Sequence, residues 1–395
     1  MEFIRCQYPG FIGDFQTDVN DALTNSWGQK RSDYTNKCEQ LLCEITGRKY
    51  CLMLSHGTSA LITAFKSLPL KKGEIVGVPS FTWVSTASAI IHAGGIPVFL
   101  DIDENSSTLG KKAISQIEQF SLKTVALVQL CGEMADPLFI EYCKNNSIKI
   151  IEDATHVLGG ASSKLVANEK YIGGKTGIAS CFSFQATKTA TAGQGGALLT
   201  DDDEIIKNAR LYSHHGIDKS ATRQFYWSSK LGDNFTISDF QCALIYSQIK
   251  QIDKLRKLRR ELYLSYIREY DSLRPKEYTI RPYFDDELNI PYLPLISIKS
   301  SKDANNGNIK ELCLNAEWIE KYNIELRPSV YPLHLMEPFR EYFDRNTTDL
   351  TNTITTSNTT LILPFGNRFP NDLCKEVLVR LENVLRDARL EYKKE

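Results

Sequence analysis

The sequence predicts an α/β protein with a mostly parallel sheet that helices cover on both faces. Between about residues 50 and 200, short β-branched runs alternate with segments of helical periodicity, including Thr58–Leu68 and Asp136–Asn145. A repeated strand–helix–strand order is typical of a parallel sheet, whose ligands bind beyond the carboxyl ends of the strands. The expected strands are Ile75–Val78, Ile96–Leu100, Thr124–Leu130, Ile148–Glu152, Cys181–Phe184 and Ala197–Thr200.

A smaller C-terminal α/β unit is expected after this region. Apolar residues recur at helical intervals from Ile237 towards Tyr266, which predicts a long helical segment joining the two units. We therefore expect a large domain over residues 1–250, including the N-terminal segment, and a small domain over residues 251–395. In the small domain we expect strands at Leu295–Ile298 and Leu361–Pro364, helices near Asn308–Tyr322 and Asn371–Tyr392, and loops at Ser300–Asn308 and Asn346–Thr360.

Composition and charge exclude several classes of protein. The chain has 395 residues, of which 42% are hydrophobic and 24% charged, the usual balance of a globular protein. Its 47 basic and 48 acidic residues leave a net charge of −1, so no overall electrostatic field favours nucleic acid or anionic lipid. The N-terminus has no signal-peptide pattern, and no apolar run is long enough to span a membrane. We expect a soluble, cytoplasmic protein.

The ten cysteines agree with that compartment. They are scattered, with no C-x-x-C pair and no Cys/His cluster at the spacing of a zinc site. We expect reduced, mostly buried thiols and no metal site, because a free cysteine behaves as a small hydrophobic residue.

Two expected helix starts carry residues that suit a phosphate and an aromatic ring. Gly57 is followed by Thr58 and Ser59, so backbone N–H groups and two hydroxyls meet at the positive end of a helix dipole. These groups suit a phosphate monoester, although the segment taken alone is more typical of a plain N-cap. Trp83 follows the strand Ile75–Val78, where it can lie flat on an aromatic ligand; taken alone, a core position is the more typical interpretation.

Two further segments offer an anion and an amine at strand ends. Asp153 directly follows an apolar strand, where a bare carboxylate is costly unless a cation meets it. His156, three residues later, either contacts the same ligand or fixes the turn. Lys188 follows the aromatic-flanked Ser183 and precedes the glycine-rich stretch Gly193–Gly196. A partly desolvated lysine at such a place loses pKa and becomes an amine nucleophile suited to a Schiff base.

Taken together, these segments predict one ligand. A helix start suited to a phosphate, an aromatic side chain suited to stacking, a carboxylate and an amine are all expected at the same edge of one sheet. Pyridoxal phosphate needs all four, because its phosphate suits a helix N-terminus, its ring a stacking partner, its pyridinium nitrogen a carboxylate and its aldehyde a lysine.

The chain resembles the sugar aminotransferases of the DegT/DnrJ/StrS family, which belong to the fold-type-I pyridoxal-phosphate enzymes. The resemblance covers most of the chain, and its motifs occur in the family's order. The matching stretches are Ser55–Leu61, Val78–Val84, Gly94–Phe99, Ile151–Ala154, Phe182–Phe184, Lys188, Gly195–Gly196, His215–Ile217, Gly232–Asn234, Ser238–Gln241, Pro332–His334 and Leu363–Pro364.

This resemblance implies a fold of the aspartate-aminotransferase type and a role for each motif. Lys188 is expected to carry the cofactor as a Schiff base, and Asp153 to pair with the pyridinium nitrogen. Trp83 is expected to stack on the ring, with His156 near it. The resemblance further implies that Gly57, Thr58, Ser59 and Ser183 bind the phosphate, that Asn234 of a second subunit joins them in a homodimer with shared active sites, and that His334 approaches the substrate.

The implied reaction is transamination. An amino acid, L-glutamate by the resemblance, gives its amino group to a keto- or aldehydo-sugar, expected to be nucleotide-linked, for amino-sugar, lipopolysaccharide or other surface-polysaccharide biosynthesis. Three alternatives stay open: a free sugar acid such as an 8-oxo octulosonate as acceptor, a pyridoxal-phosphate-dependent lyase or dehydratase, and a non-catalytic regulator that retains the fold.

Overall fold

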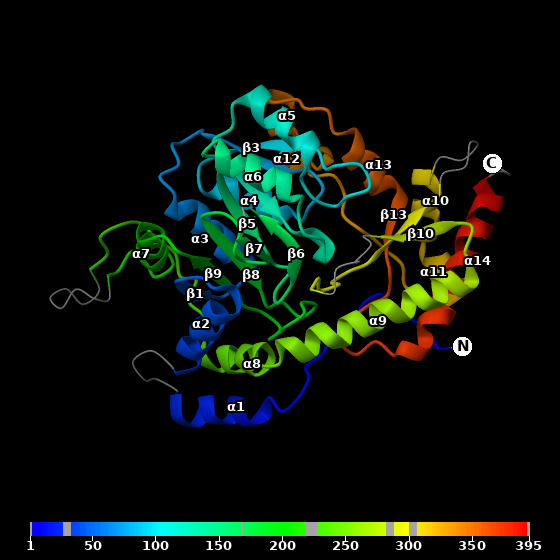
Figure 1. The fold of residues 1–395 in the computed structure, drawn as a ribbon, viewed down its shortest axis with the longest axis horizontal. Helices are drawn as coiled ribbons and strands as arrows, with labels where there is room; N and C mark the ends of the chain where they lie inside the picture. Colours follow the sequence, from blue (N-terminus) through cyan, green and yellow to red (C-terminus); the bar gives the residue numbers. More distant parts are fainter. Residues whose placement is uncertain are drawn as a thin grey trace.

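The structure is a computed structural model of the chain with two packed α/β units (Figure 1). A large sheet with its helices forms one unit, and a smaller sheet beside the long helix α9 (Ile252–Leu273) forms the other. The structure describes residues 2–26, 33–166, 169–218, 227–281, 288–299 and 306–392.

The large sheet has seven strands, and six of them run in the same direction. Only β9 is antiparallel to its two neighbours, β1 and β8, so the mostly parallel sheet expected from the sequence is confirmed. Across the sheet the order is β1 (Tyr50–Leu54), β9 (Gly196–Thr200), β8 (Ala179–Ser183), β5 (Lys149–Asp153), β4 (Thr124–Val128), β2 (Ile75–Pro79) and β3 (Ile96–Leu100).

Helices cover both faces of this sheet because apolar residues alternate along its strands. On β4, Ala126 faces one core while Val125 and Leu127 face another, as a period of two requires. The first face is covered by α3 (Gly57–Ser67), α4 (Val84–His92), α7 (Asp203–Tyr212) and α12 (Glu337–Arg345). The second is covered by α2 (Asp33–Thr46) and α8 (Asp239–Ile249) at one end and by α5 (Lys111–Phe120) and α6 (Pro137–Asn145) at the other.

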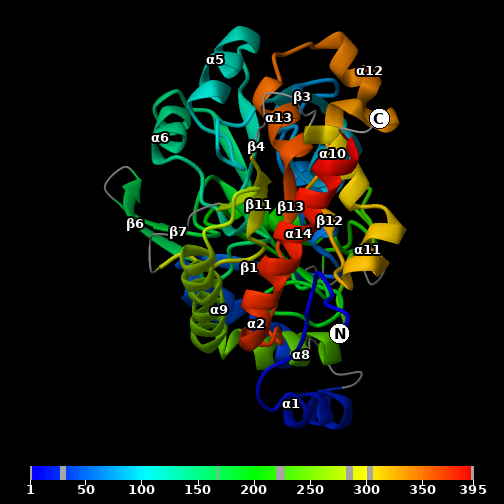
Figure 2. The same cartoon turned by 90° about the vertical axis from the view of Figure 1, so that its right-hand side faces the viewer.

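The small unit is a four-stranded antiparallel sheet packed against helices (Figure 2). Its core joins Tyr263 and Tyr266 of α9 to Trp318 and Leu381. The strand order is β10 (Tyr278–Arg281), β11 (Leu295–Ile298), β13 (Thr360–Ile362) and β12 (Arg327–Pro328). The helices are α9, α10 (Asn306–Cys313), α11 (Ala316–Tyr322), α13 (Thr351–Thr359) and α14 (Cys374–Tyr392).

The first residues of the chain pack against the small unit. Ile4 forms an isolated parallel bridge with Ile324 and lies in the small unit's core, and Gln7 bridges to Phe365. The chain then passes to α1 (Gln16–Asp21) and a π-helical turn, Ala22–Ser26, beside the large unit. The division at residues 1–250 and 251–395 stays a prediction, and these contacts show that residues 4–7 belong structurally with the second part.

The expected long helical segment is two helices. It breaks at Lys250 and Gln251 between α8 and α9. The expected helix near Asn308–Tyr322 is likewise split, because Asn315 caps α11 by accepting the Glu317 N–H over 3.0 Å. Of the expected loop Ser300–Asn308, residues 300–305 lie outside the described residues and the rest begins α10.

The expected loop at Asn346–Thr360 is wrong, because most of it forms helix α13. Asp101, fully buried on the large unit, accepts the N–H groups of Asn352 and Thr353 over 3.0 and 2.7 Å and so caps the first turn. Thr360 Oγ1 donates to the Thr356 carbonyl over 2.7 Å. The composition favoured a loop because Asn and Thr have weak helix propensity, and a cap from a distant strand end overrides it.

The remaining elements lie at the edges of the units. Strands β6 (Ala161–Val166) and β7 (Glu169–Ile172) form a separate hairpin.

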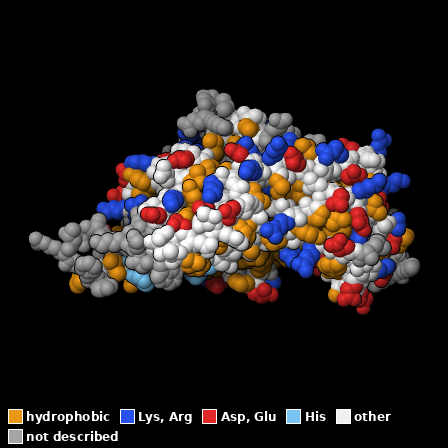
Figure 3. All heavy atoms as spheres, turned by 90° about the horizontal axis from the view of Figure 1, so that it is seen from below, with side chains coloured by type: hydrophobic (Ala, Val, Ile, Leu, Met, Phe, Trp, Pro, Cys, Tyr) orange, Lys and Arg blue, Asp and Glu red, His pale blue; other side chains and the backbone are white. Residues whose placement is uncertain are grey.

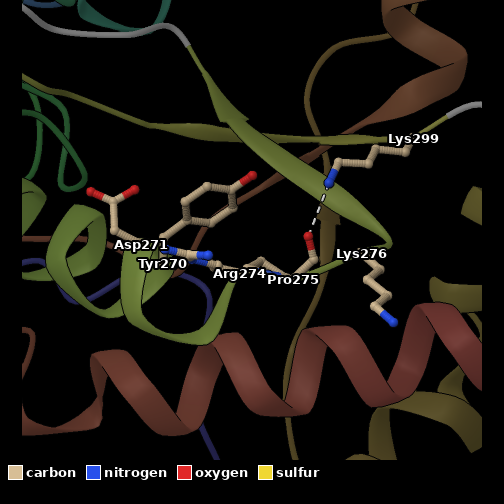
Figure 4. A pocket seen from close by; sticks show the side chains of 6 residues that line it. All are labelled: Tyr270, Asp271, Arg274, Pro275, Lys276 and Lys299. Carbon is tan, nitrogen blue, oxygen red and sulfur yellow. Dashed lines mark hydrogen bonds between the residues drawn. The ribbon is translucent and has the colours of Figure 1, made fainter.

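A surface hollow of about 560 Å³ lies where α9 ends, and Lys299 Nζ donates there to the Pro275 carbonyl over 2.9 Å (Figure 4). Its lining is Tyr270, Asp271, Arg274, Pro275, Lys276 and Lys299, all within the small unit. Among the helices that the structure describes, none is both long and apolar enough to cross a membrane.

Candidate active site

Polar residues gather at one edge of the large sheet because parallel strands end together there. Strands β5 and β8 end at Asp153 and Ser183, and the residues that follow β1, β2 and β4 are Ser55, Ser80 and Gln129. The register supports this, since Val128, the last residue of β4, lies opposite Asp153.

The first turn of α3 forms a cradle for an anion. Its first intrahelical bond runs from the Ala60 N–H to the His56 carbonyl, so the helix leaves the N–H groups of Gly57, Thr58 and Ser59 without an intrahelical acceptor. A Cβ atom on Gly57 would lie 2.7 Å from Ser183 Cβ. The turn can therefore approach the end of β8 this closely only with glycine at position 57, which brings backbone N–H groups and the Ser183 hydroxyl together.

Asp153 places a carboxylate below this edge. It is buried, and its Oδ2 accepts a hydrogen bond from Thr86 Oγ1 over 2.8 Å. Its Oδ1 accepts the Thr155 N–H over 3.3 Å. Two donors thus offset part of the cost of burying the charge, and a cationic ligand group would offset more.

His156 is held as a neutral imidazole. Its Nδ1 accepts the Cys131 N–H over 3.1 Å, so the ring proton lies on Nε2. Burial holds the pKa of His156 well below its usual range, and the positive charges of Lys188 and Arg259 lower it further. The imidazole stacks on Tyr292 with ring centroids 4.1 Å apart and an interplanar angle of 21°.

Lys188 lies on a closed turn after β8. The Lys188 N–H donates to the Gln185 carbonyl over 2.9 Å, and the Ala186 N–H donates to the Gly193 carbonyl over 3.0 Å. Lys188 Nζ lies 5.0 Å from the centroid of the Tyr292 ring. Tyr292 therefore contacts His156 and lies under the Lys188 amine, which brings these two sequence-predicted residues to one place.

Trp83 and Asn234 are exposed. Trp83 precedes α4, directly beyond β2, and 65% of its surface is accessible, which contradicts the alternative of a core tryptophan. Asn234 lies on the segment between α7 and α8, where its Oδ1 accepts a hydrogen bond from Thr236 Oγ1 over 2.6 Å. The next residue, Phe235, accepts the Ser55 N–H on its carbonyl over 2.9 Å, so this segment borders the cradle.

His334 is buried on a short turn, Leu333–Leu335, at the same edge. Its Nδ1 lies 2.8 Å from Ser80 Oγ, and its ring packs against Phe343 with centroids 4.8 Å apart. Burial lowers the pKa of His334 to about 4. His334, from the C-terminal part of the sequence, thus contacts Ser80, which follows β2 and lies three residues before Trp83.

Sequence reasoning missed Tyr292, Thr86 and Cys131. Thr86 lies one turn after Trp83 on α4, so its place beside the strand end could have been inferred from helical spacing. Tyr292 carries no motif and comes from another unit, and Cys131 acts through its backbone N–H. No local sequence pattern predicts the stacking of Tyr292 on His156 or the hydrogen bond from the Cys131 N–H to His156.

Comparison with known proteins identifies the family. The profile of the DegT/DnrJ/EryC1/StrS aminotransferase family matches residues 11–382. The chain belongs to this family. The expected class of enzyme, a pyridoxal-phosphate-dependent sugar aminotransferase, and its cofactor are confirmed.

Individual relatives agree with this assignment. The chain is 26% identical over 380 residues to the spore coat polysaccharide biosynthesis protein SpsC of Bacillus subtilis, covering 94% of each chain. It is 26% identical over 347 residues to a GDP-perosamine synthase of Escherichia coli O157:H7, covering 88% of this chain and 90% of the synthase. Helicobacter pylori PseC, an aminotransferase involved in pseudoaminic acid biosynthesis, has the same fold, with a TM-score of 0.86 at 24% identity over 98% of this chain and 100% of PseC.

The depressed pKa of His334 predicts a pH dependence of stability. The usual pKa of a histidine is 6.5, whereas the pKa of His334 in the folded protein is about 4. As pH falls from 6.5 to about 4, the unfolded chain takes up a proton that the folded chain does not, so the folded state loses stability. The slope of the unfolding free energy against pH measures how many more protons the unfolded state binds than the folded state. We expect His334→Asn to lower this difference by up to about one proton in this pH window, as measured by urea unfolding at a series of pH values.

The control for this measurement is the exposed His92→Asn variant, which should leave the slope unchanged. Equal slopes for wild type and His334→Asn would show that His334 does not resist protonation in the fold.

Proposed function

We propose that this aminotransferase moves an amino group from L-glutamate to a nucleotide-linked keto- or aldehydo-sugar, in the cytoplasm, for surface-polysaccharide biosynthesis. The observation that carries the proposal is the meeting of Lys188, Asp153 and an anion cradle at one sheet edge. Relatives named for spore coat polysaccharide and for GDP-perosamine support the choice of substrate class. The ten free cysteines suit a reducing compartment.

The residues at the sheet edge fit pyridoxal phosphate. Bound there, the cofactor supplies an aldehyde that carries the amino group and a ring that takes up an electron pair. The cradle at Gly57 suits its phosphate, because a larger side chain would fill the space beside Ser183. Thr58 and Ser59 would add hydroxyl and backbone donors at the positive end of α3. Trp83, exposed at the mouth, is suited to cover one face of the ring, with His156 near the ring.

Asp153 would hold the proton on the ring nitrogen. A buried carboxylate stabilises a cation that it faces more strongly than a solvated one does, because little water screens the pair. The hydroxyl of Thr86 and the N–H of Thr155 fix the direction of the carboxylate. This charge would keep the ring electron-withdrawing while the proton on the donor's Cα is removed.

Lys188 would act twice. Its Nζ is the group that would hold the cofactor covalently in the resting enzyme. As a free amine, it would be the group that removes the proton from the donor's Cα and returns one to the sugar carbon that receives the nitrogen. The closed turn from Gln185 to Gly193 limits the directions from which the amine can reach these atoms.

Replacing Lys188 and Asp153 tests these two roles separately. Lys188→Ala should abolish turnover and covalent attachment, measured as protein-bound cofactor after borohydride reduction and mass spectrometry. Asp153→Asn keeps the size of the side chain but loses its charge, so attachment should persist while kcat falls by several orders of magnitude. Near-normal transamination by Lys188→Ala, or a loss below about tenfold in Asp153→Asn, worth about 1.4 kcal/mol, would contradict the assignment.

The acceptor can be identified with a panel of sugars. With L-glutamate as donor, we expect amination of keto-sugars linked to a nucleoside diphosphate, detected as the mass of the aminated product together with 2-oxoglutarate. Preference for a free sugar acid such as an 8-oxo octulosonate would replace the proposed acceptor. A product formed without consumption of glutamate would instead indicate a lyase or dehydratase.

We propose that two copies of the chain share their active sites. Apolar side chains are exposed around the segment that carries Asn234, including Trp227 and Leu231 at 63% and 98% accessibility. Hydrophobic and histidine side chains are exposed toward the left of Figure 3. A partner of the same kind would bury these side chains and receive Asn234 beside its own cradle.

Subunit mixing tests the shared site. We expect Lys188→Ala and Asn234→Ala homodimers each to have low activity. After subunit exchange, one site of each mixed dimer would combine the native lysine with the partner's native asparagine, so activity should rise to about a quarter of the wild-type value. If Asn234 acts within its own chain, mixing restores nothing, and a monomer in sedimentation would contradict the dimer directly.

A further inference from the structure

Tyr292 connects the small unit to the candidate active site. It lies just before β11, and it is buried with 2% of its surface accessible. Nothing in the proposed chemistry requires a tyrosine from this unit. Its ring and hydroxyl nevertheless contact the residues that surround the proposed catalytic amine.

The ring of Tyr292 and the backbone of Cys131 together fix His156. Tyr292 stacks on the imidazole with centroids 4.1 Å apart. The Cys131 N–H donates to His156 Nδ1 over 3.1 Å, while the Cys131 carbonyl accepts the Tyr292 N–H over 3.4 Å. Cys131 has a φ of 60°, a left-handed conformation that is unfavourable for a residue other than glycine. Cys131 thus bonds to the ring of His156 and to the backbone of Tyr292.

The hydroxyl of Tyr292 reaches the turn that carries Lys188. It lies 3.1 Å from Thr187 Oγ1, and Thr187 Oγ1 also donates to Gln185 Oε1 over 2.8 Å. The Lys188 amine lies over the same ring, 5.0 Å from its centroid. The tyrosine therefore contacts the Thr187 side chain of this turn through its hydroxyl and the Lys188 amine through its ring.

A buried arginine holds Tyr292 in place. Arg259 Nη1 donates to the Tyr292 carbonyl over 3.0 Å, and Arg259 Nε donates to Asn367 Oδ1 over 2.8 Å. Asn367 Nδ2 in turn donates to the carbonyl of Thr189, the residue after Lys188, over 2.9 Å. These side chains of α9 and the segment after β13 tie the backbone of Tyr292 to the backbone beside Lys188.

The large unit is shaped to receive this segment. A Cβ atom on Gly132 would lie 2.5 Å from the Ile290 carbonyl oxygen and 2.8 Å from the Tyr292 nitrogen, and the φ of Gly132 is 90°. Only glycine allows so close an approach in that conformation. The contact between the units is therefore specific at this point.

We propose that Tyr292 is a positioning residue, which holds the His156 ring and the Lys188 turn in the geometry that proton transfer needs. The inference rests on the proposed role of Lys188. It makes docking of the small unit part of active-site assembly, since the tyrosine and the arginine that anchors it both come from that unit.

The test compares Tyr292→Phe and Tyr292→Leu with wild-type holoenzyme. Phenylalanine keeps the stacking and loses the hydroxyl, so we expect kcat to fall a few-fold. Leucine loses both, so we expect kcat to fall between about tenfold and 100-fold, with KM for the sugar changed by less than about twofold. The visible circular dichroism per bound cofactor, which reports the orientation of the ring, should change in Tyr292→Leu and return towards wild type in Tyr292→Phe.

Tyr266→Phe is the matched control. Tyr266 is also fully buried on the small-unit side, and its hydroxyl donates one hydrogen bond, to the Pro364 carbonyl over 2.8 Å. We expect it to lower the melting temperature about as much as Tyr292→Phe, while kcat and the dichroism stay at wild-type values. If Tyr292→Leu fails to fold, Gly132→Ala supplies the second variant, because its methyl group displaces the Tyr292 backbone without altering the tyrosine itself.

Two results would overturn the inference. One is a Tyr292→Leu or Gly132→Ala enzyme with wild-type kcat and dichroism. The other is a control variant with the same catalytic loss, which would make the effect one of general stability. Neither result resembles failure of the proposed function, in which the Lys188→Ala variant would keep its covalent cofactor.

Discussion

The carboxylate of Asp153, buried where β5 ends, is the constraint that organises the candidate site. A negative charge in that place is tolerable only with donors around it, and Thr86 and Thr155 supply two of them. The strands β8 and β1, which lead to the Lys188 turn and to the cradle at Gly57, run in the same direction as β5, so their carboxyl ends lie at the same edge of the sheet. Anion, amine and cradle thus share one edge as a result of topology.

Two neutral histidines show how burial sets the electrostatics of this edge. His156 and His334 both have a depressed pKa, and each uses Nδ1 in a hydrogen bond that orients its ring. The positive charges that act on the His156 imidazole are those of Lys188 and Arg259.

Much of this architecture follows from the sequence, and the exceptions have physical causes. The strands of the large sheet and the residues at their ends were predictable, because alternation and strand-end polarity are local patterns and parallel topology brings the ends together. Asp153 and Lys188 could be inferred in that way. Tyr292 could not, because its contacts join residues distant in sequence. The sequence predicts a loop in place of helix α13, because the residue that caps the helix, Asp101, lies about 250 residues earlier in the chain.

The packing of Ile4 beside Ile324 has a consequence for biosynthesis. The core of the small unit contains both Ile4 and Ala388, so it cannot close until residue 388 has been synthesised. The segment from β1 to α8 contains every strand of the large sheet and can collapse earlier on the ribosome. During that interval Ile4 has no Ile324 to pair with, because residue 324 has not yet been synthesised.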